Sequence, residues 1–448
     1  MEKNSIGNRV VKKIGSSYIV WFAESNRWIE FREPAWLVYT GQQKGEPAEK
    51  IVSRLSEKYG LPETEARRFY GEIVDAIRTS SKRGYPETPG ILEKTDSPRF
   101  FKNFSTRYYR VDKKHFTIDF GSQEMEHYIH PAFAHLETES CPEQSPHFRI
   151  HSGAPDQHQQ QHPDRGRQQQ QHPDRNLHEP LRQNRQHPDR DPQGQLPQPA
   201  VQAGLDPINP EFFVPSASQL KKDYFLATGS DMEYAFNDPG VLKHRLYIEI
   251  TSFLYGIPVS DFMCFIHASA VSRDDEAILF CSPSGSGKST MAALLQLPDQ
   301  VGNEISFMSD DFVPVDFCNC MAYPFPAALS LKKGSSHIAG AFNDPASQES
   351  VRSGPVHYLP PPSRGSGMLR PKNVKKIIFI KYDPQVSFKM EQISATDALS
   401  VFHKEAWINP ADGHAKRFLD WFVTLEYFKL HHSDDDRAVG AIRRLFGL

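Results

Sequence analysis

Cysteine is scarce in this sequence, with five residues among 448, and the two closest, Cys318 and Cys320, have one residue between them. This spacing fits neither a disulfide framework nor a zinc site. No stretch approaches the roughly 18 consecutive apolar residues of a membrane-spanning helix, and the first residues, MEKNSIGNRVVKK, lack the apolar segment of a signal peptide. We therefore expect a reducing, cytoplasmic location and no membrane partner.

The sequence also has no excess of positive or of negative charge. The chain has 52 Lys and Arg against 55 Asp and Glu, a net charge of −3, which argues against a nucleic-acid partner. Only 38% of the residues are hydrophobic and 35 are proline, so an unfolded stretch is expected to lower the average. The length exceeds one ordinary domain and predicts two or three.

Low complexity marks the middle of the chain. Gln, His, Pro, Asp and Arg dominate residues 151–205, where the pentapeptide QHPDR recurs. Because such a stretch cannot offset its ordering entropy by burial, we expect a disordered insert there. The other predicted boundaries are 1–82 for a small N-terminal domain, 83–98 for a linker, 99–150 for the first part of the main domain and 206–448 for the rest of it.

The N-terminal domain is expected to be a small winged-helix-like α+β unit. Residues 9–24 and 28–31 are rich in Val, Ile, Trp and Phe, which favours short paired strands. Two stretches with helical periodicity follow, AEKIVSRLSEKY before Gly60 and LPETEARRFYGEIVDAI after it.

In the main domain, strand-like and helix-like stretches alternate, which predicts an α/β core. A helix is expected to begin after Asp238 as N-cap and to end at Gly256. The C-terminal stretches 394–408, 415–430 and 435–448 are predicted to be helical.

The stretch AILFCSPSGSGKSTMAALL, residues 277–295, has the strand–loop–helix pattern of a P-loop. Backbone N–H groups of such a loop surround phosphate oxygens, Lys288 supplies a charge for the β and γ phosphates, and Ser289 offers a hydroxyl to Mg²⁺. Ser282 stands where the motif usually has its first glycine. The candidate nucleotide-binding residues are Ser284, Gly285, Ser286, Gly287, Lys288, Ser289 and Thr290.

Two carboxylates follow in EISFMSDDFVPVD. We expect a strand beside and parallel to the P-loop strand to carry Asp310 and Asp311 to the phosphates. One can hold Mg²⁺ while the other accepts the proton of an attacking hydroxyl. His267, in FIHASAV, ends another strand-like run; on its own, a histidine after apolar residues is more often structural than functional.

Together, HASA at 267–270, SPSGSGKST and SDDFVPVD resemble the catalytic domain of the HPr serine kinase/phosphorylase family, which is related to the phosphoenolpyruvate carboxykinase P-loop fold. The resemblance covers roughly 220–448 and implies ATP as phosphate donor. It also implies a catalytic role for His267 and Lys288, Asp310 as general base, and Asp311 with Ser289 as Mg²⁺ ligands.

Two outlying basic residues, Lys332 and Arg370, lie in stretches similar to those of HPr-kinase-related proteins; they are candidates for phosphate or substrate contact, with ordinary surface charge as the alternative. The family's Arg- and Gly-rich regulatory stretch, which accompanies phosphorylase activity, is missing, so phosphorylase activity and regulation of sugar uptake through HPr stay open. Whether the chain forms a homo-oligomer stays open.

Residues 9–78 resemble the PqqD family, small domains that bind the leader peptides of ribosomally made, modified peptides. The resemblance implies that an extended leader adds a strand to a sheet edge. A DNA-binding winged helix is the alternative, but residues 48–78 hold six basic and six acidic residues rather than a basic stripe.

The leading hypothesis is therefore a kinase that moves the γ-phosphate of ATP to a Ser or Thr hydroxyl of a precursor peptide, for example of a lasso peptide, whose leader the N-terminal domain captures. A second hypothesis is a kinase for an HPr-like carrier protein or a small hydroxyl compound. A third is a nucleotide-gated peptide-binding chaperone without transfer activity.

Overall fold

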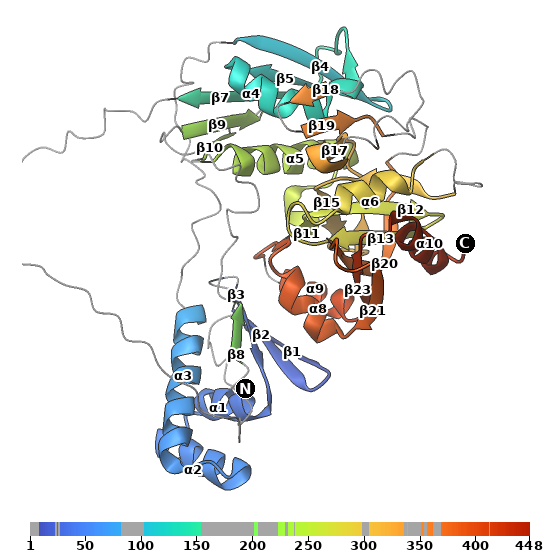
Figure 1. The fold of residues 1–448 in the computed structure, drawn as a ribbon. Coiled ribbons are helices and arrows are strands. Elements are labelled where there is room, and N and C mark those ends of the chain that lie inside the picture. The colour runs from blue at the N-terminus through green and yellow to red at the C-terminus, as the bar shows by residue number, and fades with distance from the viewer. Residues whose placement is uncertain are drawn as a thin grey trace, which may run out of the picture.

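The computed structural model is a mixed α/β protein in which an N-terminal unit, a large central sheet and a second, six-stranded sheet follow one another along the molecule (Figure 1). It describes residues 9–22, 25, 27–81, 103–153, 201–204, 223–228, 232–236, 238–297, 304–335, 338, 351–353, 356–361, 369–411 and 413–448. The predicted linker at 83–98 and residues 154–200 of the predicted insert lie outside these ranges.

The N-terminal unit combines an antiparallel meander with three helices. Its elements are β1 (Arg9–Ile14), β2 (Ser17–Phe22), β3 (Arg27–Phe31), α1 (Glu33–Gln43), α2 (Ala48–Tyr59) and α3 (Glu63–Ser81). The expected strands and both expected helices are present; α1 was not predicted. Gly60 ends α2 with a φ of 66°, a conformation that glycine adopts without steric cost.

A fourth strand completes this sheet from far along the chain. β8 (Val201–Gly204) pairs antiparallel with β3, so that Trp28 lies opposite Gly204 and Phe31 opposite Val201. The expectation of a wholly disordered insert over 151–205 is therefore wrong at both of its ends. Residues 151–153 continue strand β7 (His147–Gly153), and 201–204 form β8, because main-chain hydrogen bonding to a free sheet edge does not require apolar side chains.

The six-stranded sheet is assembled from strands on both sides of residues 154–200, since β7 pairs with β9. Its order is β10-β9-β7-β5-β4-β6, and α4 (Gln123–Ile129) lies against it. The remaining strands are β4 (Ser105–Val111), β5 (Lys114–Phe120), β6 (Glu137–Thr138), β9 (Asp223–Thr228) and β10 (Met232–Phe236).

Helix α5 (Pro239–Tyr255) connects the six-stranded sheet to the central sheet. Asp238 caps it as predicted, since its Oδ1 accepts from the N–H groups of Gly240 and Val241. The ring of Tyr247 packs against Phe133, which belongs to the segment between β5 and β6 of the six-stranded sheet, and against Phe312, which precedes β15 (Val313–Asp316) of the central sheet. The ring centroids are 5.5 and 5.7 Å away. These contacts join the two sheets through one aromatic core.

The central sheet runs β14-β12-β13-β20-β16-β15-β11-β22, with β23 beside β20 and β21 beside β23. Its strands are β11 (Phe262–Ile266), β12 (Ala268–Arg273), β13 (Glu276–Cys281), β14 (Ser306–Ser309), β15 (Val313–Asp316), β16 (Met321–Ala322), β20 (Lys372–Tyr382), β21 (Phe388–Ile393), β22 (Ala406–Ile408) and β23 (Glu426–His432). A small sheet of β17 (Leu329–Lys332), β19 (Val356–Leu359) and β18 (Val351–Ser353) lies apart from it.

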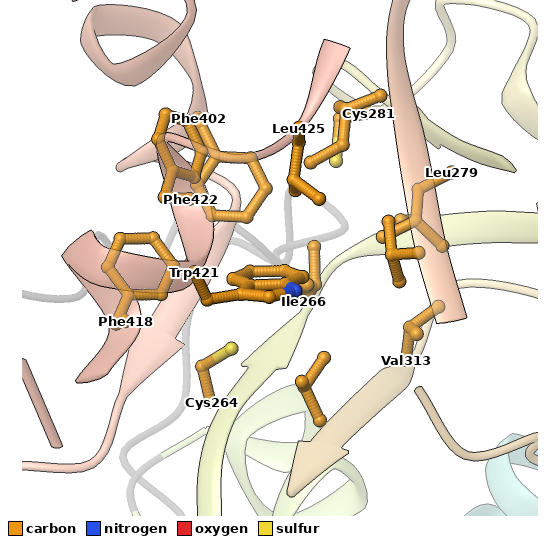
Figure 2. Packing of buried hydrophobic residues seen from close by; sticks show 14 of the residues in the cluster. Cys264, Ile266, Leu279, Cys281, Val313, Phe402, Phe418, Trp421, Phe422 and Leu425 are labelled. Atoms are coloured by element: carbon orange, nitrogen blue, oxygen red, sulfur yellow. The ribbon is translucent and has the colours of Figure 1, made fainter. Parts of the chain in front are cut away.

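Both faces of the P-loop strand β13 are buried, which explains its continuous apolar sequence. Leu279 and Cys281 face one core, into which α8 (Ala395–Phe402) and α9 (His414–Phe422) insert the aromatic cluster of Phe402, Phe418, Trp421 and Phe422 (Figure 2). Ile278 and Phe280 face the opposite core with α6 (Lys288–Leu294) and α10 (Asp435–Leu445). This packing fixes the end of β13 from which the P-loop emerges.

Three predictions about this sheet are wrong. The strand that carries the aspartates, β14, is not beside the P-loop strand, because β12 forms a hairpin with β13 and takes that position. The helical stretch predicted at 415–430 ends with α9 at Phe422, and the remainder is β23, which pairs in parallel with β20. Likewise 406–408 is a strand. Packing on neighbouring strands outweighs the helical periodicity of these segments.

The N-terminal unit is attached to the central domain through β1 and α9. Lys12 forms an ion pair with Asp420, and the ring of Trp28 lies 5.7 Å from that of Phe418. Ile14 and Ile19 are buried in the same core as Trp421. None of the helices in the described ranges is both long enough and apolar enough to cross a membrane.

Candidate active site

The loop between β13 and α6 contains two glycines in left-handed conformations. Gly285 and Gly287 adopt φ values of 86° and 106°, which L-residues with a Cβ rarely tolerate. Ser282 has no positive φ and is buried, so serine replaces the usual glycine there without backbone strain. Lys288 is only 4% exposed and its Nζ donates to the carbonyl of Ser282 at 2.6 Å, which holds the charge against the loop.

Asp310 lies beneath this loop, where several donors meet its carboxylate. Ser269 and Ser289 donate to Oδ1 at 2.5 and 2.8 Å, and the N–H of Ser330 donates to Oδ2 at 2.8 Å. The side chain is buried. Burial and the negative charge of Asp311 together raise the pKa of Asp310 to about 6, although the hydrogen bonds oppose this shift.

Asp311 accepts from the same Ser330 hydroxyl as Asp310, at 3.0 Å to Oδ2, but its side chain stays partly exposed. Its φ of 60° lies in the left-handed region, which aspartate tolerates better than most residues, and its side chain keeps 40% exposure. Its Oδ1 lies 3.5 Å from Nε2 of His267. Burial alone would raise the pKa of Asp311, but His267, Lys288 and Lys243 outweigh it and hold this pKa well below its usual value.

Glu405 contacts both the ring and the backbone of His267 and fixes its orientation. Its Nδ1 lies 2.8 Å from Glu405 Oε2, and its backbone N–H donates to the Glu405 carbonyl at 2.7 Å. Burial opposes the charged ring, yet the hydrogen bonds to Asp311 and Glu405 prevail and raise the pKa of His267. The ring lies between the carboxylates of Glu405 and Asp311, so a lone histidine in the sequence proves to be part of the cluster.

Lys243 of α5 adds a positive charge that the sequence did not reveal. Its Nζ lies 5.4, 5.5 and 6.0 Å from the ring centroids of Tyr128, Tyr247 and Tyr358. Burial disfavours the charged form, but the tyrosine rings and Asp311 more than compensate and raise the pKa of Lys243 well above its ordinary value. A caged ammonium therefore lies on the Asp311 side of the site.

The two outlying basic candidates, Lys332 and Arg370, differ in their contacts with the loop. Lys332 reaches the loop, since its Nζ donates to Ser284 Oγ at 2.7 Å, and Thr290 shares a 2.6 Å hydrogen bond with Ser335. Arg370 is exposed and precedes β20, whose opposite end adjoins the loop. Among the described residues, Arg370 forms no hydrogen bond or ion pair with the P-loop or the aspartates; its contact with phosphate or substrate stays a prediction.

The contacts of the predicted Mg²⁺ ligands differ from the sequence prediction. Ser289 was paired with Asp311 as a metal-binding set, but its hydroxyl donates to Asp310. The cause is the turn after β14: Asp310 continues the strand toward the loop, and the left-handed conformation of Asp311 directs the next carboxylate to His267. The two aspartates therefore share the Ser330 hydroxyl through their Oδ2 atoms, while Oδ1 of Asp310 faces Ser289 and Oδ1 of Asp311 faces His267.

Within the described residues, no group of three or more His, Cys, Asp or Glu side chains forms a complete metal site. No family model matches the sequence, and no curated protein matches it.

Proposed function

We propose that the chain is an ATP-dependent kinase that phosphorylates a Ser or Thr hydroxyl of a ribosomally made precursor peptide. The observation that carries the proposal is the convergence, at one end of β13, of the P-loop Lys288, the Ser289–Asp310 pair and the Asp311–His267 pair. Charge to hold phosphates, a hydroxyl–carboxylate pair and a reachable carboxylate are the groups that phosphoryl transfer requires.

The donor set of Ser289 and Asp310 fits Mg²⁺. This ion is usually held by one or two carboxylates together with substrate phosphates rather than by a complete protein cage, which agrees with a hydroxyl and a carboxylate 2.8 Å apart beside the loop. When bound with ATP, the ion supplies charge neutralisation at the phosphates. We therefore assign Ser289 and Asp310 to the metal, in place of Ser289 and Asp311.

Asp311 then becomes the acceptor for the proton. An attacking hydroxyl must reach the base, and the side chain of Asp311 is 40% exposed while Asp310 is buried. The hydroxyl oxygen forms a bond to the γ phosphorus, the bond from that phosphorus to the β–γ bridging oxygen breaks, and the hydroxyl proton passes to Asp311. His267 fixes the position of this carboxylate.

The N-terminal unit is proposed to capture the leader. β8 lies antiparallel on the edge of β3, and α3 contacts both strands. An edge that accepts four residues of this chain has the main-chain geometry to accept an extended peptide, and the adjacent helix offers side-chain contacts for specificity. Capture raises the local concentration of the attached acceptor to about millimolar.

The test is the intact mass of a candidate precursor peptide after incubation with the protein, ATP and Mg²⁺. One added phosphate, absent with Lys288→Ala, is expected. The same peptide without its leader should lose at least tenfold in kcat/KM. An equal rate without the leader would favour a small-molecule or carrier-protein kinase, and nucleotide binding without any phosphorylated product would favour a chaperone.

The two aspartates are distinguished by Mg²⁺ titration. Asp310→Asn should raise the Mg²⁺ concentration for half-maximal activity, whereas Asp311→Asn should lower kcat and leave that concentration unchanged. The reverse pattern would restore Asp310 as the base and Asp311 as the metal ligand.

A further inference from the structure

The parallel strands of the central sheet end together next to the P-loop. β13, β20 and β23 run in the same direction, and their last residues are Cys281, Tyr382 and His432. In open α/β sheets, ligands bind outside the carboxyl ends of the parallel strands. A nucleotide whose phosphates lie on the loop after β13 therefore has the ends of β20 and β23 as its neighbouring surface.

Tyr382 is joined directly to the loop. Its backbone N–H donates to the carbonyl of Ser286 at 2.9 Å, and a Cβ placed on Gly287 would lie 3.9 Å from its own Cβ. The next residue, Asp383, donates its N–H to the carbonyl of His432, which ties β20 to the end of β23. The backbone position of the tyrosine is thus set by the same contacts that shape the loop.

The ring itself is left largely uncovered. Tyr382 is 52% exposed, and only Val11 and Phe104 stand with it as exposed large hydrophobic residues of the described ranges. The ring of the buried His432 meets it edge-to-face at 5.9 Å, which supports one side of it. An aromatic ring that is held in place and exposed beside a phosphate loop has the properties of a stacking platform.

We propose that Tyr382 is the nucleobase platform of this site and that it stacks against the purine ring of the nucleotide. The proposal rests on the proposed function in that it needs a nucleotide on the P-loop, and it adds where the base lies and why a purine is preferred. A purine has more area than a pyrimidine to cover the exposed ring, and stacking requires no hydrogen-bonding partner for the base.

The experiment is calorimetric binding of MgADP, MgUDP and inorganic tripolyphosphate to the full chain. For Tyr382→Ala we expect MgADP affinity to fall about tenfold, the preference for MgADP over MgUDP to disappear, and tripolyphosphate affinity to stay within twofold of wild type. Tyr382→Phe keeps the ring and should bind MgADP like wild type. Phe104→Ala removes a comparably exposed ring distant from the loop and should change nothing.

The backbone bond to Ser286 persists in every Tyr382 variant, so a folded protein is expected, and its melting temperature checks this. Unchanged MgADP affinity in Tyr382→Ala would overturn the proposal. An equal loss of MgADP and tripolyphosphate would also overturn it, because the tyrosine would then support the loop rather than the base. If wild type binds tripolyphosphate but gains nothing from the base, the platform is refuted while the phosphate site stands. If it binds none of the three, the proposed function fails as well.

Discussion

Adjacent aspartates of the site are expected to affect stability with opposite signs. Asp310 is buried, and its pKa is raised from the usual 3.8 to about 6, so the folded state disfavours its charge. The difference of about 2 units corresponds to roughly 3 kcal/mol, at about 1.4 kcal/mol for each unit. The penalty is absent below pH 3.8, grows between pH 3.8 and 6, and is constant above that. Removing the charge should therefore stabilise the protein at neutral pH.

Asparagine fits this environment without leaving a polar group unsatisfied. Its amide oxygen can replace Oδ2 and accept from the N–H of Ser330, while its amide nitrogen replaces Oδ1. The hydroxyls of Ser269 and Ser289 can rotate to accept from that nitrogen, because a hydroxyl is both donor and acceptor. We expect Asp310→Asn to raise the free energy of unfolding at pH 7.5 by about 1–3 kcal/mol.

Asp311→Asn should do the reverse. Its carboxylate is held ionised by His267, Lys288 and Lys243, and its stabilising contribution is present above the unfolded pKa and lost as the pH falls. Urea unfolding of both variants, with EDTA present to exclude metal, measures the two effects, and repetition at pH 4 should shrink the Asp310→Asn gain. Destabilisation of similar size by both substitutions would refute the charge argument.

Three further substitutions follow from the same structure. Lys243→Met keeps an apolar chain among the tyrosines but removes the positive charge near Asp311, so kcat should fall about tenfold with nucleotide affinity unchanged. The control is Lys114→Met, which removes an ammonium over Phe253. An unaltered kcat for Lys243→Met would show that this charge does not contribute to the reaction. Burial lowers the pKa of His244 to about 3, so as the pH falls this histidine is protonated in the unfolded chain before it is protonated in the folded one. His244 should therefore lower the free energy of unfolding by about 2 kcal/mol between pH 7 and 5. Urea unfolding of His244→Gln should show a correspondingly shallower decline over this range, and a pH profile identical to wild type would contradict the prediction. Leu279→Ala opens a cavity behind the P-loop strand and should lower the free energy of unfolding by about 2–5 kcal/mol, measured by denaturant unfolding. The control Val11→Ala, at an exposed position, should lower it by less than about 0.5 kcal/mol. Equal effects would show that the core around Leu279 is loosely packed.

The parts of the site that the sequence predicted are those set by local chain geometry. A strand, a loop with Gly285 and Gly287 and a helix form the P-loop within twenty residues, so the motif suffices to place Lys288 and Ser289. The same holds for α2 and α5, whose periodicity and end residues act within each helix. Such features need no information about which strand lies beside which.

The parts that escaped prediction depend on contacts between distant segments. Glu405 contacts His267 across 138 residues of sequence, and Ser330 of β17 contacts Asp310 across 20. Lys243 looks like an ordinary helix residue until Tyr128 and Tyr358 from other elements surround it. Even the roles expected for the aspartates depended on the left-handed conformation of Asp311, which a consecutive Asp-Asp pair does not reveal.

The placement of β8 bears on how a leader would bind. A strand edge offers one row of N–H and C=O groups, so β3 pairs with β8 or with a leader, but not with both at the same register. Leader affinity in the full chain therefore includes the free energy of displacing β8, and the observed Kd equals the intrinsic Kd divided by the fraction of molecules with an open edge. A leader that binds must out-compete four residues, Val201 to Gly204, which carry no charged side chain. Selectivity would then come from leader side chains that α3 contacts, because the main-chain bonds gained merely replace those lost.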